Sequence, residues 1–362
     1  MSVASRRAWP AIPGPCDTVE IAASEGLWPK TACGRGPMDE TRYRLRDLLD
    51  DDFPSLARIW TRNEPERPVT GEEVRSIFRA SEDPRFIRHN RSIVEISSSE
   101  VVAGGSVWQS SLVYDPEYAF ASISVDPDHQ HRGLGRRLYE DLESAARDRG
   151  LKGLWGAART DVARSVRFLE ATGFREKRRI WVSKLDLEST SVDSSPGNPD
   201  RWATDGIVFS TLQEDGPDRP EVRVRLYQLY REAMKDTPRI GGGSHDSPGW
   251  FESVVYRRPG YLPEAIFVAR AGDRYVSFSL LYREVAAPDR LHILFTGTLP
   301  AYRGKGLAHE LKRRSIDFAR SHGYRYILTE NDSENPRIWA INQQLGFRQI
   351  RVVLMGEKQL GG

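Results

Sequence analysis

The sequence predicts an α/β layered fold with two tandem domains, each a mixed, mostly antiparallel sheet flanked by helices. Its 362 residues are about two ordinary domains long. Its two halves repeat one plan, because Gly306 stands 173 residues after Gly133, and Gly346-Phe347 repeats Gly173-Phe174 at the same offset. Within each half, short alternating apolar runs that indicate strands are interleaved with helical patterns.

Two irregular segments set the domain limits. Residues 1–40 show no sustained period and contain many small residues, so we expect a disordered leader. Residues 188–205 are rich in Ser, Pro, Gly and Asp, a composition typical of linkers. The expected domains are therefore an N-terminal half, 41–187, and a C-terminal half, 206–362.

Composition excludes several function classes. Lys and Arg number 53 and Asp and Glu 51, so the net charge is only +2 and no nucleic-acid partner is expected. The absence of an 18-residue apolar run and of a secretory h-region argues against membrane insertion and secretion, and favours the cytoplasm. Cys16 and Cys33 precede both halves, which excludes disulfides and a cysteine nucleophile within them.

The strands are expected in the same order in both halves. In the N-terminal half they are Tyr43–Leu48, Ser92–Ile96, Val101–Trp108, Tyr118–Val125 and Gly153–Ala158. In the C-terminal half they are Ile207–Leu212, Ala265–Ala269, Tyr275–Leu281, Leu291–Thr298 and Tyr326–Glu330. A helix follows the first strand of each half, at Phe53–Trp60 and at Glu221–Lys235, and a short helix and a last strand complete each half.

A longer helix is expected after the fourth strand of each half, Tyr118–Val125 and Leu291–Thr298. The apolar stripes of these helices are Leu134, Leu138, Leu142 and Ala145 in the first, and Leu307, Leu311, Ile316 and Ala319 in the second. Gly150 and Gly323 are suited to end the helices, because glycine readily adopts the left-handed conformation found just after a helix.

A glycine loop leads into each of these helices. The loops read Gln130-His131-Arg132-Gly133-Leu134-Gly135 and Arg303-Gly304-Lys305-Gly306-Leu307-Ala308. Small residues let the backbone approach an anion, and a first helical turn offers unpaired N–H groups at the positive end of the helix dipole. Charge is added by Arg132, Arg136, Arg303 and Lys305. The loops therefore favour binding of a pyrophosphate.

Two other phosphate-binding motifs do not match these loops. The dinucleotide fingerprint needs a third glycine where this chain has Leu138 and His309. A nucleotide-hydrolysing P-loop needs a Gly-Lys-Ser/Thr ending that is also missing. The remaining alternative is that the glycines only permit a tight turn, and the repetition of the loop in both halves weakens it.

With these motifs, residues 41–362 resemble a tandem member of the GCN5-related N-acetyltransferase (GNAT) family. The resemblance is carried by SVDPDHQHRGLG with FLEATGF, and by GTLPAYRGKGLA with TENDSENPRIWAINQQLGF. It implies acetyl-CoA as co-substrate, with its pyrophosphate on the loops and its pantetheine along the strand ends. The implied cofactor-binding residues are Val125, Asp126, Gln130, Arg132, Gly133, Gly135, Arg136, Thr298, Leu299, Arg303, Lys305, Gly306, Ala308, Asn335 and Asn342.

The chain also departs from the family pattern. Val162 stands in the N-terminal half where Asn335 matches the asparagine that family members often use. The tyrosine that often acts as general acid is replaced by Leu169 and Asn342. Either the thiolate of the cofactor leaves unaided or another group protonates it, because a free thiol already has a pKa near ~8.5.

The implied reaction is attack of a neutral amine on a thioester, which needs a base and stabilisation of an oxyanion. The candidate bases are His292 and Glu330, each with the alternative of an ordinary strand or solvated side chain. The N-terminal half offers only Ser122, Ser124 and Glu117, so the C-terminal half is favoured as the catalyst.

The acceptor pocket is expected in the irregular segment 236–250, and His245 with Asp246 alone does not indicate a metal site. The leading hypothesis is a cytoplasmic N-acetyltransferase that acetylates a primary amine of a small molecule by direct attack in a ternary complex. Two alternatives stay open. One is an acetyl-CoA-binding regulator or scaffold with degenerate transferase sites, and the other is a protein or peptide N-acetyltransferase.

Overall fold

A computed structural model describes residues 36–79, 86–110, 114–190, 200–237 and 247–361. Nearly all of the predicted leader, the middle of the predicted linker at 191–199 and most of the predicted acceptor segment, at 238–246, lie outside the described residues. Within the described ranges no helix is both long and apolar enough to cross a membrane.

Every strand expected from the sequence is present. Those of the N-terminal half are β1 (Tyr43–Asp47), β2 (Arg88–Glu95), β3 (Glu100–Trp108), β4 (Tyr118–Val125), β5 (Gly153–Arg159) and β6 (Arg175–Asp186). Those of the C-terminal half are β7 (Ile207–Thr211), β8 (Tyr261–Ala271), β9 (Arg274–Arg283), β10 (Arg290–Thr298), β11 (Tyr326–Asp332) and β12 (Arg348–Gln359).

The helices also follow the predicted plan, with additions. The N-terminal half contains α1 (Phe53–Asn63), α2 (Gly71–Arg79), α3 (Leu134–Asp148) and α4 (Ala163–Ala171). The C-terminal half contains α7 (Pro220–Ala233), α9 (Leu307–Ser321) and α10 (Pro336–Gln344), with the short α5 (Asp200–Ala203), α6 (Leu212–Asp215) and α8 (Pro248–Phe251). The first helix continues three residues beyond the expected Trp60, and α2 was not predicted.

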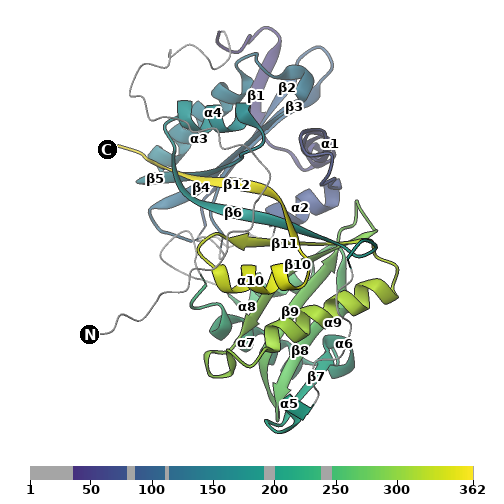
Figure 1. The fold of residues 1–362 in the computed structure, drawn as a ribbon. Coiled ribbons are helices and arrows are strands. Elements are labelled where there is room, and N and C mark those ends of the chain that lie inside the picture. Colours follow the sequence, from purple (N-terminus) through teal and green to yellow (C-terminus); the bar gives the residue numbers. More distant parts are fainter. Residues whose placement is uncertain (1–35, 80–85, 111–113, 191–199, 238–246, 362) are drawn as a thin grey trace, which may run out of the picture.

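All twelve strands form one sheet, in the order β1-β2-β3-β4-β5-β12-β6-β11-β10-β9-β8-β7. β12, from the C-terminal half, pairs with β5 of the N-terminal half, and β6 pairs with β11 in return (Figure 1). β6 and β12 also pair with each other at the centre of the sheet. The two halves have therefore exchanged their final strands, which the sequence pattern did not predict.

Helices cover both faces of the sheet, as the sequence predicts. On β3, Gly104 faces Leu56 of α1, whereas its neighbour Gly105 faces Leu142 of α3. Because successive strand residues point to opposite faces, α1 and α3 lie on opposite sides of the sheet. An added Cβ at Gly104 would meet a Leu56 methyl at 2.4 Å, so this glycine lets α1 pack close to β3.

Candidate active site

Each glycine loop ends in a left-handed glycine that opens a long helix. Gly133 has φ 77° and precedes α3, and Gly306 has φ 79° and precedes α9. This conformation is strained for residues that carry a side chain. At Gly133 a Cβ would also come within 2.8 Å of the backbone of Gly36 and Met38. Both loops thus direct the first helical turn, with its unpaired N–H groups, toward the end of the preceding strand.

The first residue of each loop motif contacts the protein itself. Nε2 of Gln130 donates to the carbonyl of Val125 and to Oδ1 of Asn63, both at 3.1 Å. In the C-terminal half, Arg303 donates to the carbonyl of Thr298 at 3.1 Å and pairs with Asp236 at 2.8 Å. Gln130 thus ties its loop to the end of β4 and to α1, and Arg303 ties its loop to the end of β10 and to the chain just after α7.

Arg132 and Lys305, which were expected to add charge to the loops, also have partners in the protein. Arg132 donates to the hydroxyl of Tyr43 at 2.9 Å. Lys305 pairs with Asp205 at 2.7 Å, and its carbonyl accepts from the indole of Trp202 at 3.0 Å. Arg136 lines the cavity described below.

The strand before each loop parts from its parallel neighbour, and we call each such parting a fork. β4 pairs with β5 only over Tyr118–Phe120, and β10 pairs with β11 only over Arg290–Ile293. Beyond these residues one edge of β4 and of β10 has no partner strand in the described sheet. An extended ligand with amide groups can hydrogen-bond to such an edge, as an added strand does.

A cavity of about 720 Å³ follows the fork of the N-terminal half. It begins at the glycine loop, runs past Val125, Gly133, Gly135 and Arg136, and is walled by Tyr139, Phe168 and Phe174. At its other end it reaches Arg67, and then Glu330 and Arg351 of the C-terminal half. This cavity thus connects a predicted cofactor loop with residues from the exchanged part of the sheet.

A second chamber, of about 400 Å³, lies between α1, α2 and the sheet. Leu56, Trp60 and Phe78 give it an apolar interior. Its wall shares six residues with the larger cavity, namely Asn63, Glu64, Arg67, Ser122, Ile123 and Ser124. The two spaces therefore meet along β4.

The fork of the C-terminal half is flanked by titratable side chains. His292 lies one residue before the last paired residue of β10, and its Nδ1 is 3.3 Å from Oε1 of Glu284. Both side chains are buried, and the imidazole stacks on Tyr282 with a ring separation of 5.2 Å. A carboxylate at Nδ1 fixes the tautomer in which Nε2 carries the lone pair. His292 lines neither of the two cavities above.

β10 carries an irregularity at the same place. Its register against β9 shifts between Ile293 and Phe295, so Leu294 is an extra residue. A bulge of this kind leaves main-chain groups without a ladder partner. No such shift interrupts the pairing of β3 with β4.

Glu330 is the first residue of β11 beyond the fork. It accepts a hydrogen bond from Arg67 at 3.2 Å, across the boundary between the halves. Burial raises the pKa of Glu330, but the Arg67 guanidinium, His292 and two further arginines lower it more, so its pKa lies below the usual range. The carboxylate is therefore ionised near neutral pH.

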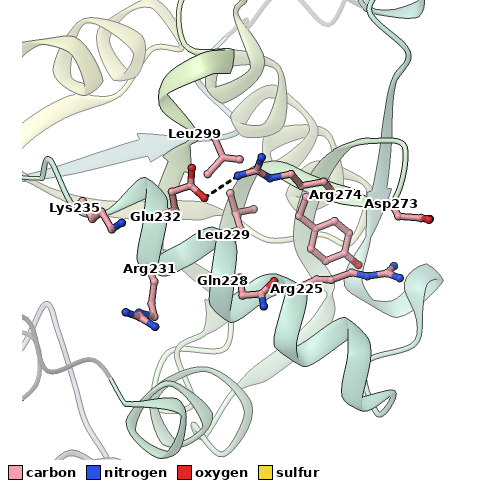
Figure 2. Close-up of a pocket in the computed structure, with 10 residues that line it drawn as sticks. Arg225, Gln228, Leu229, Arg231, Glu232, Lys235, Asp273, Arg274 and Leu299 are labelled. Atoms are coloured by element: carbon pink, nitrogen blue, oxygen red, sulfur yellow. Dashed lines mark hydrogen bonds and ion pairs between the residues drawn. The ribbon is translucent and has the colours of Figure 1, made fainter.

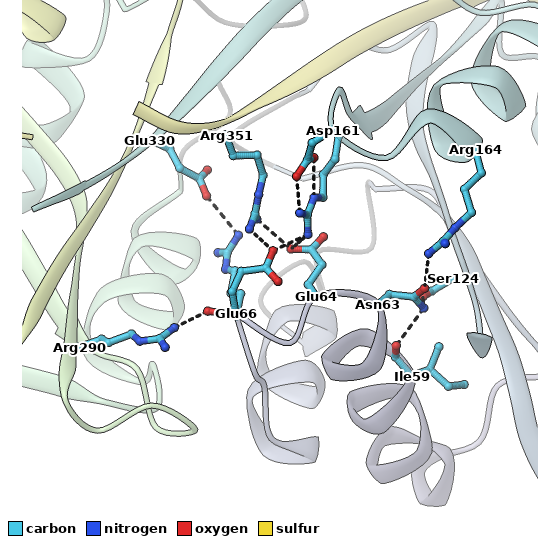
Figure 3. A network of polar contacts seen from close by, with 12 residues as sticks. Ile59, Asn63, Glu64, Glu66, Ser124, Asp161, Arg164, Arg290, Glu330 and Arg351 are labelled. Carbon is cyan, nitrogen blue, oxygen red and sulfur yellow. Dashed lines mark hydrogen bonds and ion pairs between the residues drawn. The ribbon is translucent and has the colours of Figure 1, made fainter. Parts of the chain in front are cut away.

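A network of polar contacts joins the halves around the segment 64–67 (Figure 3). Arg351 of β12 binds Glu64 at 3.2 Å and also Glu66. Arg159 of β5 contacts Glu66 as well, and the carbonyl of Glu66 accepts from Arg290. The segment 64–67, whose Glu64 and Arg67 line both cavities, is thus held by residues of both halves.

The interior beside the C-terminal fork is more polar than its counterpart. Asn342 is buried and donates to Oδ1 of Asn331 at 2.7 Å, so it contacts the protein rather than an open groove. Lys312 is buried against the ring of Phe347, and burial lowers its pKa to about 7. Asn335 caps α10 through Ile338. Tyr139, Ala158 and Leu169 occupy the positions of Lys312, Asn331 and Asn342 in the N-terminal half.

Two residues predicted to bind the cofactor, Asp126 and Leu299, contact neighbouring parts of the protein. Asp126 is buried and binds Arg62, and its N–H donates to Val102. The N–H of Leu299 likewise donates to Val276. Leu299 lines a different cavity of about 620 Å³, beside α7 and the β8–β9 turn. There Arg274 pairs with Glu232, and the other charged side chains point in different directions rather than toward one centre (Figure 2).

Sequence reasoning missed several residues of this region. Glu284 could have been found by counting register across the β9–β10 connection, which pairs Tyr282 with His292. Arg67 and Arg351 gave no signal, because they meet Glu330 and Glu64 only through the exchanged strands.

The sequence of this chain is similar to those of known acetyltransferases. The sequence model of the acetyltransferase (GNAT) family matches residues 43–174 and 225–347, which is more than half of the chain. A mycothiol acetyltransferase of Corynebacterium glutamicum (strain R) is 22% identical over 236 residues, covering 65% of this chain and 74% of that protein. The mycothiol acetyltransferase of Thermobifida fusca (strain YX) is 26% identical over 272 residues, covering 72% and 80%.

The fold has a similar solved structure. A tandem GNAT protein from the clavulanic acid biosynthesis pathway superposes with a TM-score of 0.70 at 15% identity. The match covers 88% of this chain and 99% of that one, so the two-half architecture is shared along almost the whole length.

Proposed function

This chain belongs to the acetyltransferase (GNAT) family, and from that premise we propose that it acetylates a primary amine of a small molecule. In this proposal acetyl-CoA is the donor, and the amine attacks its thioester directly in a ternary complex. The proposed setting is the cytoplasm. The mycothiol acetyltransferase relatives, whose name denotes a small-molecule product, favour a small acceptor over a protein.

The donor is proposed to bind along a fork with its pyrophosphate at a glycine loop. The first turns of α3 and α9 offer N–H groups and the positive end of the helix dipole. The side chains that add charge beside the first loop are Arg136, Arg164 and Arg167, which line the cavity there. The pantetheine arm would pair with the open edge of β4 or β10.

The chemistry is proposed for the C-terminal fork, and the position of His292 and Glu330 on either side of that fork is the observation that carries it. Nε2 of His292, oriented through Glu284, takes the proton from the attacking amine. A main-chain N–H at the Leu294 bulge would donate to the developing oxyanion. The thiolate leaves with little help, because a free thiol has a pKa near ~8.5.

Release of free thiol from acetyl-CoA, measured over a library of amines and peptides, tests this function. We expect turnover with small amines and a loss of about 100-fold or more in kcat for His292→Gln, within the range for a general base. His322→Gln is the control, since His322 is exposed just after α9 and its hydrogen bonds among the described residues are local, to Phe318 and Ser321. Thiol release only with peptides, or none with any amine, would overturn the proposal.

A further inference from the structure

The ion pair between Arg67 and Glu330 lies in the wall of the large cavity and joins the N-terminal half to the C-terminal half. Each side chain is 40% exposed, and the two are joined at 3.2 Å between Nη1 and Oε1. Within the described residues this is the one hydrogen bond that the Arg67 guanidinium makes. The cavity therefore presents a cation and an anion side by side to whatever enters it.

The backbone that carries Arg67 is held in place by hydrogen bonds and ion pairs of the segment 64–67. The N–H of Arg67 donates to the carbonyl of Glu64 at 2.9 Å, closing a turn. The carboxylates of Glu64 and Glu66 bind Arg351, whose side chain is only 7% exposed, and Arg290 binds the carbonyl of Glu66. The guanidinium of Arg67 is thus presented from a rigid base, as binding sites require.

The surroundings of Glu330 suit a ligand better than a purely structural pair. A partly exposed ion pair contributes little to stability, so little is lost when its members bind a ligand instead. Arg258 lies on the ring of Tyr282, 3.8 Å from its centroid, and adds positive charge near Glu330. Glu330 itself flanks the fork at which the thioester is proposed to lie.

From this arrangement we propose that the acceptor is a zwitterion of the amino-acid type, whose carboxylate binds Arg67 while its amine binds Glu330. An α-amino acid carries both groups on one carbon, so its charges lie at a spacing comparable to the 3.2 Å that separates Nη1 of Arg67 from Oε1 of Glu330. The guanidinium is suited to a carboxylate because its planar N–H groups match the two oxygens. The inference rests on the proposed function and specifies the acceptor class for the same site.

The position of Arg67 gives the N-terminal half a defined part in this site. Arg67 is supplied by the connection between α1 and α2, whereas Glu330 and His292 belong to the C-terminal half. Arg67 is then a specificity-determining residue contributed across the boundary between the halves. It would select acceptors by their carboxylate without contacting the thioester.

The test compares matched acceptors. Free-thiol release is measured with a panel of amino acids, their amides and the corresponding decarboxylated amines, each at varied concentration. We expect the wild-type protein to prefer the acids, and Arg67→Gln to raise the KM for the preferred acid at least tenfold. The KM for acetyl-CoA should change less than twofold, and Arg67→Lys should restore part of the preference because it retains the charge.

A matched control separates this role from general stability. Arg179→Gln removes an arginine from a comparable ion pair with Glu176, in which the side chains are 50% and 42% exposed and which lines neither cavity. Equal turnover of acids, amides and decarboxylated amines by the wild type would overturn the inference while leaving the proposed function intact. Equal KM increases in R67Q for acids and amides would also overturn it. No turnover with any amine would instead refute the proposed function.

Discussion

The two halves share one plan but differ at the fork. In the N-terminal half the residues that follow the paired stretch are Ala121 on β4 and Gly156 on β5. In the C-terminal half Glu330 follows it on β11, and His292 lies one residue before the last pair on β10. The second fork is therefore flanked by titratable side chains, whereas the first is flanked by small ones. A duplicated fold can thus keep the same fork in both halves while the side chains beside it diverge.

A register difference accompanies this divergence. Ala119 pairs with Leu154 and belongs to the core cluster beside α3. At the 173-residue offset His292 corresponds to Ala119, yet it pairs with Leu328 rather than with Ile327, the counterpart of Leu154. A shift of one residue turns a strand side chain to the other face of the sheet. The bulge at Leu294 thus explains why a histidine at a core position can join Tyr282 and Glu284 instead.

The difference between the halves is tested most strongly by blocking one glycine loop at a time with a negatively charged side chain. Gly135 and Ala308 occupy equivalent positions in the first turns of α3 and α9. A glutamate there is tolerated by the helix but repels a pyrophosphate. We expect Ala308→Glu to lower kcat/KM for acetyl-CoA by about 100-fold or more, because a charged group next to a phosphate site removes several favourable interactions.

Gly135→Glu is the matched variant. A Cβ at Gly135 would stay 3.6 Å or more from Phe168 and Val125, so the backbone has room for a side chain. We expect it to remove one acetyl-CoA from the binding stoichiometry in calorimetry while kcat changes less than twofold. A larger loss of kcat in G135E than in A308E would assign the chemistry to the N-terminal half.

Arg178 on β6 and Arg351 on β12 occupy equivalent positions in the two halves, at the centre of the sheet. Arg178 pairs with Asp332, which is only 10% exposed, whereas Arg351 pairs with Glu64 and Glu66, which are about 40% exposed. Removal of a cation beside a buried carboxylate is the more damaging change. In chemical unfolding, Arg178→Met should lower stability by about 2–3 kcal/mol and Arg351→Met by about 1 kcal/mol.

Only the second variant should also affect the acceptor. Arg351→Met releases the segment that presents Arg67, so the acceptor KM should rise although the loss of stability is smaller. If R178M raises the acceptor KM as much as R351M does, the network has no special relation to the acceptor.

The last comparison concerns the pH dependence of stability and the buried lysine of the C-terminal half, Lys312, whose counterpart is Tyr139. Burial lowers the pKa of Lys312 to about 7, well below that of an unfolded lysine, so between these values the unfolded chain binds more protons. Stability should therefore rise with pH above about 7, by roughly 2 kcal/mol between pH 7 and pH 9 from this residue. Lys312→Met should flatten that rise relative to the wild type in unfolding midpoints, and parallel pH curves for the two proteins would contradict the assignment.

Local signals in the sequence predicted much of this molecule. The left-handed glycines Gly150 and Gly323 that follow α3 and α9, the apolar stripes of these helices, and every predicted strand follow from spacing along the chain. The roles of Gln130 and Arg303 were less accessible, since a loop motif does not reveal that its first side chain ties the loop to Asn63 or Asp236. Which residues meet at the junction depended on strand order, and alternating apolar residues fit either neighbour equally well.

The exchanged strands have a consequence for how the protein is made. β12 leaves the ribosome after every other strand, yet it fills the gap between β5 and β6 in the middle of the sheet. Until then β5 and β6 each carry an unpaired edge, which is a template for association with other chains. A chain whose synthesis stops before β12 would therefore be an aggregation-prone fragment with a divided sheet, and not a folded first domain. Likewise, after proteolysis between the halves the two fragments would remain associated, because β12 pairs with β5 and β6 pairs with β11.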